Sequence, residues 1–354
     1  MTPKKLQQAF EQWTRSGEPL VLASVYETEG STYSKTGAQM LINSAGDFRG
    51  MLSGGCLEGD LAERARAVIE SGVPQAVTYD LGLNDEQLWG LGVGCDGLMR
   101  IFLQALLPAN DYQPFAAMSR VYDGQEKQVA ATVLESEVEG LVPGSALVTV
   151  DGKTAFTDTG GQHREAIEQQ AASVLAAGES RVVELDIADA TAKVLFSVLR
   201  PPPRVLVLGA GLDAEPVVRL ATELGWRVTV QDHRPAYVEA GDFTSAERVV
   251  CVPVHDLQKE IDLAPFAAAI VMSHHLASDL EYLRQLATTN LEYIGLLGPR
   301  DRKRRLLEDL GELADRLTPR LHGPAGIDIG GRGPASIALS IVAEMHRELM
   351  QEDV

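Results

Sequence analysis

Short apolar runs alternate with amphipathic segments in the C-terminal part of the chain. The apolar runs lie at 204–208, 226–231, 267–272 and 291–297. Segments with helical period lie between them, at 213–224 and 278–289. Nearly continuous apolar runs are typical of strands buried on both faces, and the intervening helical period predicts crossover helices. The pattern therefore predicts a Rossmann-like, doubly wound parallel sheet, an α/β fold.

The N-terminal part has a mixed pattern. An amphipathic stretch at 5–17 ends at Gly17 and predicts a helix, and the apolar run at 19–30 predicts a strand. The stretch 38–52 predicts two strands around a turn at Gly46. Beyond residue 110, helical and strand-like segments are interleaved. We therefore expect an N-terminal mixed α+β domain.

Three consecutive prolines mark the predicted boundary. Pro201 to Pro203 stand directly before the run at 204–208, and proline continues neither a helix nor a central strand. We therefore divide the chain into an N-terminal region, 1–200, and a Rossmann-like domain, 201–354. Within the first region, 1–107 carries motifs and 108–200 carries none that we attach to chemistry.

Composition and charge narrow the classes of function. The chain has 354 residues and a formal net charge of -19, which argues against nucleic acid or an anionic membrane as a partner. The N-terminal residues lack the apolar core of a signal peptide, and no apolar run is long enough for membrane insertion. We expect a cytoplasmic protein. The 3 cysteines include no CxxC pair, which disfavours a structural zinc site.

A glycine turn follows the first strand of the predicted sheet. Gly209, Gly211 and Ala214 fit the G-x-G-x-x-[G/A] pattern that brings a helix N-terminus and free backbone N–H groups to a phosphate. Asp232 ends the next strand, where a ribose-binding acid would stand. The pattern predicts a site for a nucleotide-like or pterin-like ligand. An unliganded tight turn is the alternative.

Other polar residues follow later strands and should reach the same edge of the sheet. His274 or His275 offers a hydrogen bond or proton transfer to a ligand. Gly298 precedes the charged run at 300–305, whose first arginine, Arg300, stands nearest the edge and is a candidate phosphate ligand. The glycine-rich stretch 326–333 precedes a helix and offers further backbone donors, or simply caps that helix.

Cys56 directly follows Gly54 and Gly55 and precedes a segment with one apolar face. Gly55 is a candidate N-cap, which would place Glu58 third in the helix and Cys56 in its first turn. There the helix dipole favours the thiolate, although Glu58 opposes this locally. The arrangement makes Cys56 a candidate ligand-contacting thiol.

The other two cysteines differ in their surroundings. Cys95 lies in a glycine-rich loop that includes Gly94, which permits close backbone approach to a ligand. Two thiols in two glycine loops suggest a shared cleft. Cys251, within an apolar stretch, fits a small buried hydrophobe.

Several of these stretches together resemble the XdhC/CoxI family of molybdenum hydroxylase accessory proteins. The matching stretches are GSTYSKTGAQMLINSAGDFRGMLSGGCLEGDLAE, VTYDLGLNDEQLWGLGVGCDG, PPPRVLVLGAGLDAEPVV, VMSHHLASDLEYLRQL, YIGLLGPRDRKRRLL and GIDIGGRGPASIALSIVAEM. Two features depart from the family pattern. Asp96 stands where the family often has glycine, which weakens a role for Cys95, and His274 fits the family's histidine run better than His275.

The resemblance implies a maturation chaperone rather than an enzyme with its own turnover. Such proteins bind molybdenum cofactor (molybdopterin) as cargo, support its sulfuration with a cysteine desulfurase, and insert it into an apo-hydroxylase such as xanthine dehydrogenase. In this chain Cys56 would contact molybdenum, and a homodimer is consistent with the family. The alternatives are an NAD(P)-dependent oxidoreductase and a nucleotide-sensing regulatory protein, both using the Rossmann domain.

Overall fold

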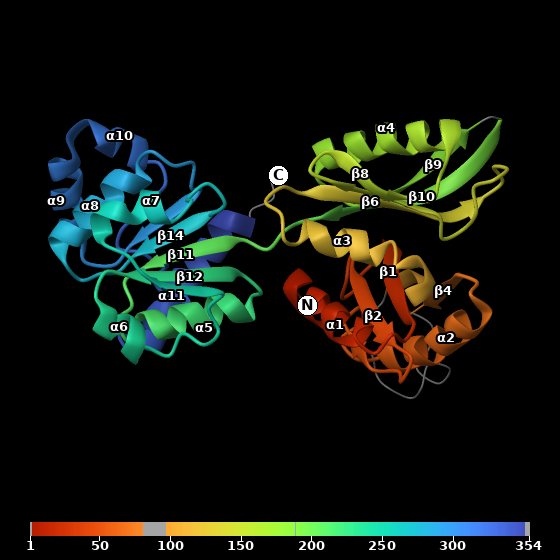
Figure 1. Cartoon of the computed structure of the whole chain (residues 1–354), viewed down its shortest axis with the longest axis horizontal. Helices are drawn as coiled ribbons and strands as arrows, with labels where there is room; N and C mark the ends of the chain where they lie inside the picture. The colour runs from red at the N-terminus through yellow and green to blue at the C-terminus, as the bar shows by residue number, and fades with distance from the viewer. Residues whose placement is uncertain (1, 81–96, 188, 351–354) are drawn as a thin grey trace. The chain divides into compact units, whose positions relative to one another are not determined.

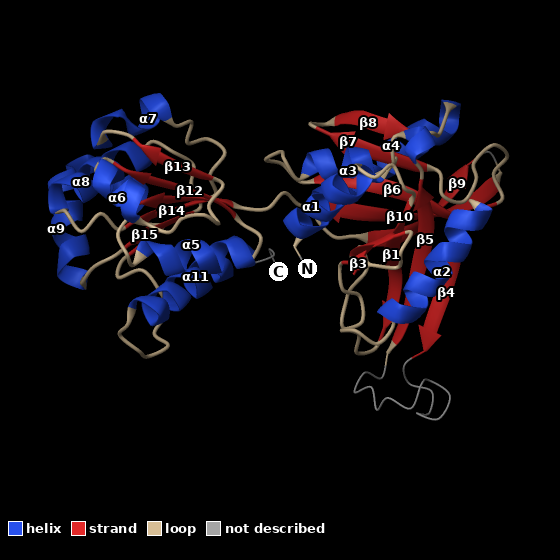
Figure 2. Cartoon of the chain, turned by 60° about the horizontal axis from the view of Figure 1, so that its bottom comes forward, coloured by secondary structure: helices blue, strands red, loops and turns tan. Residues whose placement is uncertain are grey.

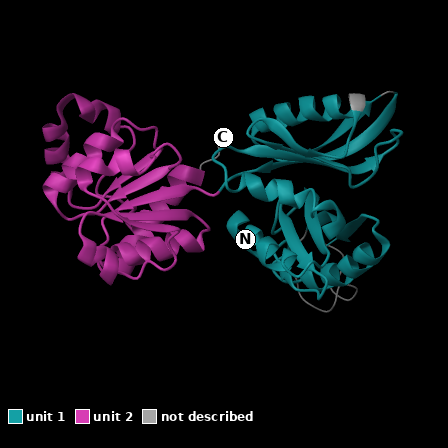
Figure 3. Ribbon diagram, viewed as in Figure 1, with its two compact units in different colours: residues 1–201 teal, residues 202–354 magenta. Residues whose placement is uncertain are grey.

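The computed structural model describes residues 2–80, 97–187 and 189–350. The chain divides into two compact units, Met1–Pro201 and Pro202–Val354 (Figure 3). Within the described ranges, no helix combines the length and apolar character that crossing a bilayer requires.

In its described residues, the first unit contains two antiparallel sheets and four α-helices (Figure 1). One sheet has the order β3-β2-β1-β5-β4 and the other has the order β8-β7-β6-β10-β9. In chain order the elements are α1 (Pro3–Thr14), β1 (Leu20–Glu29), β2 (Gln39–Asn43), β3 (Phe48–Arg49), α2 (Glu58–Ser71), β4 (Gln75–Asp80), β5 (Leu98–Leu106), α3 (Phe115–Val121), β6 (Gln128–Ser136), β7 (Ala146–Val150), β8 (Lys153–Thr157), α4 (Gly161–Ala177), β9 (Arg181–Ile187) and β10 (Ala190–Leu199).

Strand β1 supplies apolar side chains to both faces of the first sheet, since successive residues of a strand point to opposite sides. Val21 and Val25 pack with Leu61 of α2, whereas Leu20 packs with Phe115 of α3. Helix α4 covers the outer face of the second sheet, as Figure 1 shows. The Cys56 loop therefore precedes a helix that is anchored on a fully buried sheet face.

The second unit has one six-stranded parallel sheet with the order β13-β12-β11-β14-β15-β16. Its elements are β11 (Arg204–Leu208), α5 (Ala214–Glu223), β12 (Arg227–Asp232), α6 (Pro235–Ala240), β13 (Arg248–Cys251), α7 (Leu257–Glu260), β14 (Ala268–Val271), α8 (Leu276–Leu286), β15 (Tyr293–Leu296), α9 (Arg300–Leu310), α10 (Ala314–Leu317), β16 (Leu321–His322) and α11 (Pro334–Met350). The predicted doubly wound sheet is confirmed.

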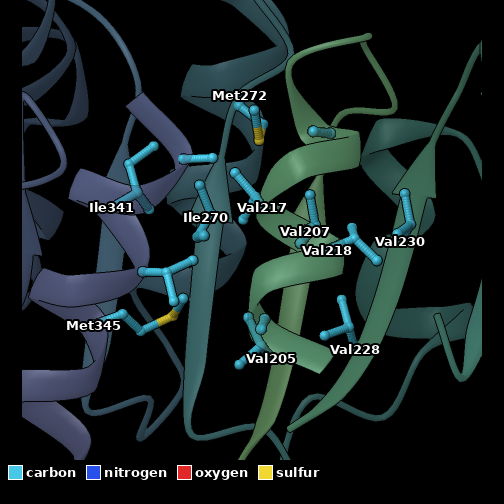
Figure 4. Packing of buried hydrophobic residues seen from close by; sticks show 14 of the residues in the cluster. Val205, Val207, Val217, Val218, Val228, Val230, Ile270, Met272, Ile341 and Met345 are labelled. Atoms are coloured by element: carbon cyan, nitrogen blue, oxygen red, sulfur yellow. The ribbon is translucent and has the colours of Figure 1, made fainter. Parts of the chain in front are cut away.

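The parallel sheet is buried on both faces. Val205 and Val207 of β11 face the layer that contains α5 and α11, which lie side by side in Figure 2. Figure 4 shows Val207, Val218 and Ile341 among the packed side chains of this layer. Leu206 and Leu208 point to the opposite layer, formed by α8 and α9. This burial explains why the strands have no polar alternation.

The sequence patterns missed some short elements. The region without motifs forms the second antiparallel sheet, and its strand β8 was not predicted. In the parallel sheet, the edge strands β13 and β16 were also missed. Strand β16 has only 2 residues, and β13 has no buried residue, unlike β14 and β15, which have the same length but are buried throughout. Neither edge strand therefore forms the continuous apolar run that marks a buried strand.

Candidate functional site

The loop before α2 is held by the buried carboxylate of Glu58, whose residue is 1% exposed. Its Oε1 accepts hydrogen bonds from the amides of Leu52 and Ser53, both at 3.0 Å. Its Oε2 accepts from the Ser53 hydroxyl at 2.6 Å, the Gly55 amide at 3.0 Å and the Leu57 amide at 3.2 Å. Glu58 therefore orders the loop, and its oxygens face loop donors rather than a ligand.

The electrostatics of Glu58 follow from these bonds. Burial raises the pKa of the Glu58 carboxyl, but hydrogen bonds from Ser53 and Leu52 outweigh burial and lower the pKa below its usual value. The group is thus a buried carboxylate that is stable as an anion because several donors converge on it.

The structure corrects the predicted cap and the position of Cys56. Helix α2 begins at Glu58 with Leu57 as its N-cap, so Gly55 is not the cap and Cys56 lies before the first turn. Gly54 and Gly55 have φ values of 79° and 113°, a backbone region that favours glycine. Two positive-φ residues turn the chain sharply before the cap, which moves the helix start beyond the cysteine. The dipole argument for Cys56 therefore does not apply as predicted.

Cys56 is exposed and lines a pocket of about 460 Å³ between the turn before β3 and helix α2. Gly46, Asp60, Glu63 and Arg66 also line it. Within the part of the chain that the structure describes, Arg66 forms no ion pair, and the amides of Gly54 and Cys56 have no acceptor. The pocket thus joins a free thiol, a guanidinium and nearby free amides.

The segment around Tyr33 adjoins this loop, and Gly97 packs on the residues that precede Tyr33. The Tyr33 ring, 61% exposed, lies against Gly54: a Cβ built there would be 3.5 Å from Tyr33 Cδ2. Gly97 packs so closely on the backbone of residues 29–31 that a Cβ would be 2.6 Å from the carbonyl oxygen of Ser31. Tyr33 was missed as a site residue, although it lies in a stretch that carried the family resemblance. Gly94 and Cys95 lie outside the described residues.

In the second unit, the glycine turn has the predicted local structure. A Cβ on Gly209 would be 2.5 Å from the Met272 carbonyl oxygen, so only glycine allows the turn to pass the end of β14. Ala214 is fully buried at the start of α5. The amides of Gly211 and Leu212 have no acceptor among the residues described, which leaves donors for a ligand.

Asp232 has a different environment from the one predicted. It is fully buried, and its Oδ2 accepts from the Ala210 amide at 2.8 Å and from Arg234 Nη2 at 2.7 Å. Burial raises the pKa of Asp232, but the hydrogen bonds from Arg234 and Ala210 outweigh it and lower the pKa. The Arg234 guanidinium also stacks on Tyr237, 3.6 Å from the ring centroid. A ribose could reach this carboxylate only by displacing Arg234.

His274 lies at the glycine turn and His275 does not. His274 Nε2 is 2.8 Å from Asp213 Oδ2, and its φ of 61° is unusual for a non-glycine residue. A Cβ on Gly211 would be 3.9 Å from His274 Cδ2, so the two residues are neighbours. His275 instead caps α8, where its ring accepts from the Ser278 amide at 3.4 Å.

The arginine run contributes two arginines with different surroundings. Arg302, not Arg300, binds the buried Asp279, with its Nε 2.9 Å from Oδ2. A Cβ on Gly298 would be 2.5 Å from Arg302 Cδ, so glycine makes room for this pair. Arg300 is exposed and lines a separate pocket beside the 326–331 loop. The spacing of the run could not show which arginine faces which way.

Cys251 is exposed, so the expectation of a buried cysteine is wrong. It ends strand β13, next to Asp232 of β12. β13 is an edge strand, and an edge strand has one uncovered side. The apolar sequence neighbours of Cys251 gave no sign of this edge position. Among the described residues, no group of three His, Cys, Asp or Glu side chains could hold a metal ion.

Comparison with known proteins identifies relatives along nearly the whole chain. Residues 13–80 match the model of the XdhC and CoxI family, and residues 205–345 match that of the XdhC Rossmann domain. A Bacillus subtilis protein described as a probable subunit of xanthine dehydrogenase is 30% identical, over 93% of this chain and 92% of its own length. The molybdenum cofactor insertion chaperone PaoD of Escherichia coli is 23% identical, over 93% of this chain and 83% of its own.

A solved structure agrees with these sequence matches. A xanthine dehydrogenase from Bacillus halodurans superposes with a TM-score of 0.79 at 27% identity, covering 99% of this chain and 96% of its own. The two family models match in the expected order on either side of the residues that carried no motif. On this evidence the chain belongs to the XdhC and CoxI family.

Proposed function

We propose that this protein binds molybdenum cofactor and inserts it into a molybdenum hydroxylase of the xanthine dehydrogenase type. The observation that carries the proposal is the pocket where exposed Cys56 lies beside Arg66. Support also comes from one relative named as part of xanthine dehydrogenase and another named as a molybdenum cofactor insertion chaperone. The cofactor is cargo in this proposal, taken up and released by the protein.

The pocket has chemistry that suits this cargo. A thiolate is a soft ligand for a metal, and Arg66 is a cation that pairs with phosphate. The free amides of Gly54 and Cys56 add donors for anionic oxygens. Two acids also line the pocket. Glu63 is exposed, so solvent and salt screen its charge. Asp60 is paired: Arg64 Nε lies 2.6 Å from its Oδ2, and Tyr79 also donates to that oxygen. Pairing reduces its repulsion of an anion in a chain of net charge -19.

The proposal includes a role in sulfuration. Cys56 would contact the molybdenum centre or carry sulfur to it, and a cysteine desulfurase would be the sulfur donor. Gly54, Gly55 and Glu58 hold the loop in the form that exposes the thiol. Tyr33 adds an exposed aromatic surface beside Gly54, suitable for contact with a flat ring.

The test replaces Cys56 by serine. Cys56→Ser nearly conserves volume at an exposed position, so the protein should fold normally, but a hydroxyl does not supply a thiolate. A reconstitution assay contains apo-hydroxylase, molybdenum cofactor, cysteine desulfurase and this protein. Its readouts are hydroxylase turnover and the cofactor retained after gel filtration. We expect client activation to fall about tenfold or more, which corresponds to a loss of about 1.4 kcal/mol of binding free energy.

Cys251→Ser is the matched control, because it makes the same change at another exposed cysteine. It should behave like wild type. If Cys56→Ser equals wild type in both cofactor retention and client activation, the thiol has no part in cargo handling. A second readout separates the alternatives: pterin fluorescence after iodine oxidation of the purified protein supports the proposal, whereas bound pyridine nucleotide favours an NAD(P)-dependent or nucleotide-sensing protein.

A further inference from the structure

A second pocket, of about 440 Å³, lies in the parallel-sheet unit beside the loop 324–331. Arg300 from the start of α9 lines it together with Ile327, Asp328 and Ile329 of the loop and Ser336 of α11. The sequence predicts that Arg300 and this glycine-rich stretch lie at the same edge of the sheet, but not that they line one pocket. The fold places them together because α9 follows β15 and the loop follows the adjacent strand, β16.

Buried polar groups fix the inner side of the loop. Glu344 of α11 is 8% exposed, and its Oε2 accepts from the Gly326 amide and the Tyr293 hydroxyl, both at 2.7 Å. The His322 ring stacks on Tyr293, and its Nδ1 lies 3.6 Å from Glu344 Oε1. Burial and this hydrogen bond raise the pKa of Tyr293, so its hydroxyl remains a donor to Glu344. The Gly326 end of the loop, which lines the pocket, is therefore held in place.

The polar side chains of the outer side remain open to a ligand. Arg300 forms no ion pair with any described residue. One oxygen of exposed Asp328 accepts from the Gly330 amide at 3.2 Å. Each carboxylate oxygen has two acceptor sites, so both oxygens can still accept from a ligand. Ile329 is 45% exposed and, with Ile327 and Ile337, provides an apolar surface. The pocket thus combines an acceptor, a cation and a surface for a flat ring.

This combination selects a particular ligand chemistry. A phosphate alone suits Arg300 but is repelled by Asp328. A ring with adjacent amino and N–H donors suits the Asp328 carboxylate, while an anionic group on the same molecule suits Arg300. A 2-amino-4-oxopyrimidine ring that carries an anionic group meets both requirements. Pterins and guanine nucleotides share that chemistry.

We infer that the loop 324–331 and Arg300 form a binding site for a 2-amino-4-oxopyrimidine ring that carries an anionic group. Asp328 accepts from the amino and ring N–H groups, and Arg300 pairs with the anion. The choice of a pterin as the natural ligand rests on the proposed function, and a pterin bound here would be a second molecule, not the cargo held at the Cys56 pocket. The site is separate from the Cys56 pocket and from the glycine turn at 209–214.

The test is titration calorimetry of the full-length protein with four probes. Pterin-6-carboxylate and GMP carry both the donor edge and an anion, xanthosine monophosphate lacks the amino group, and AMP lacks the whole edge. We expect the first two to bind about tenfold or more tightly than the others, as a pair of charge-assisted hydrogen bonds predicts. Tighter binding of pterin-6-carboxylate than of GMP identifies a pterin site, and the reverse identifies a guanine-nucleotide site.

Two variants assign the contacts. Asp328→Asn should abolish the preference for the amino-bearing probes, and Arg300→Gln should weaken all four. Asp315→Asn and Arg304→Gln make the same charge changes at exposed positions outside the pocket lining and should equal wild type. The inference fails if no probe binds, or if Asp328→Asn keeps the full preference.

The probe-binding result can be distinguished from the result of the reconstitution assay, because no probe contains molybdenum. Cys56→Ser should bind the probes like wild type, since Cys56 does not line this pocket. If the wild-type protein shows no probe preference but still activates its client, the pocket assignment alone is overturned. Normal probe binding with no cofactor retention overturns the chaperone proposal alone.

Discussion

A single buried side chain, Glu58, determines the conformation of the loop that exposes Cys56. Amides of Leu52, Ser53, Gly55 and Leu57 all donate to its carboxylate, so the anion takes the place of backbone partners that the tight loop cannot supply. Because the pKa of Glu58 is lowered in the folded protein, ionisation of Glu58 stabilises the folded state.

The first prediction at this scale concerns Glu58→Gln. The amide NH2 would face N–H donors, so we expect the free energy of unfolding of the first unit to fall by about 2–3 kcal/mol at pH 7. Glu58's contribution is fully present above its unfolded pKa, near 4.5, and is lost as the pH falls through its lower folded pKa. The difference between variant and wild type should therefore shrink in acid.

Thermal unfolding followed by circular dichroism at pH 7 and at pH 3 measures this difference. Glu70→Gln, on the exposed side of the same helix, is the control and should change little at either pH. Equal stability of Glu58→Gln and wild type at neutral pH would show that the carboxylate is not what holds the loop.

At the scale of elements, the turn between β11 and α5 meets the loop after β14 through the His274–Asp213 pair. His274 adopts a positive φ, which costs about 1 kcal/mol for a residue other than glycine. The His274–Asp213 pair lies next to Gly211. A ligand phosphate bound to the free amides of Gly211 and Leu212 would therefore lie beside the His274 ring. The His274–Asp213 contact thus connects the glycine turn to the loop after β14, so a change in one should disturb the other.

Gly211→Val tests this feature. A Cβ at position 211 would be 2.6 Å from Asp213 Oδ1, so the Asp213 side chain must move and its contact with His274 is disturbed. We expect any ligand that wild type holds at this turn to bind about tenfold or more weakly. Calorimetry with NAD+, NADP+ and molybdenum cofactor measures the change.

Gly160→Val is the control, because a Cβ at that position meets no atom within 4 Å. It should leave binding unaltered. Equal affinities of Gly211→Val and wild type for every bound ligand would remove the turn from the binding site.

At the scale of the whole molecule, each unit contains its own cores. Two hydrophobic clusters use only residues from Val205 onward, and four use only residues up to Leu199. No cluster of described residues crosses the prolines at 201–203. Each unit therefore buries enough apolar surface within itself to fold without the other.

We predict that residues 202–354 fold alone. The fragment keeps the Pro203 carbonyl that accepts from the Arg227 amide at 2.9 Å. Its circular dichroism spectrum should show mixed helix and strand, and its thermal unfolding should be cooperative. Limited proteolysis of the full chain should release a stable fragment that starts near residue 200. A fragment without ordered structure would contradict this division.

Hydrophobic periodicity and turn chemistry, both local in sequence, were sufficient for the parallel sheet and its glycine turn. The buried strand β11 and the small residue Ala214 were readable because neighbouring residues determine them. The same signals failed at β13 and β16, whose few residues gain their strand structure only from pairing with a longer neighbour.

Tertiary structure alone decided which polar side chains are available to a ligand. Asp232 fitted a ribose-binding acid, yet Arg234 and the Ala210 amide occupy it. Cys251 fitted a buried position and is exposed. Asp328 and Arg300 lie 28 positions apart and line one pocket because parallel strands bring successive loops to the same edge. Spacing determines local conformation, but burial and pairing depend on partners that only the folded chain brings close.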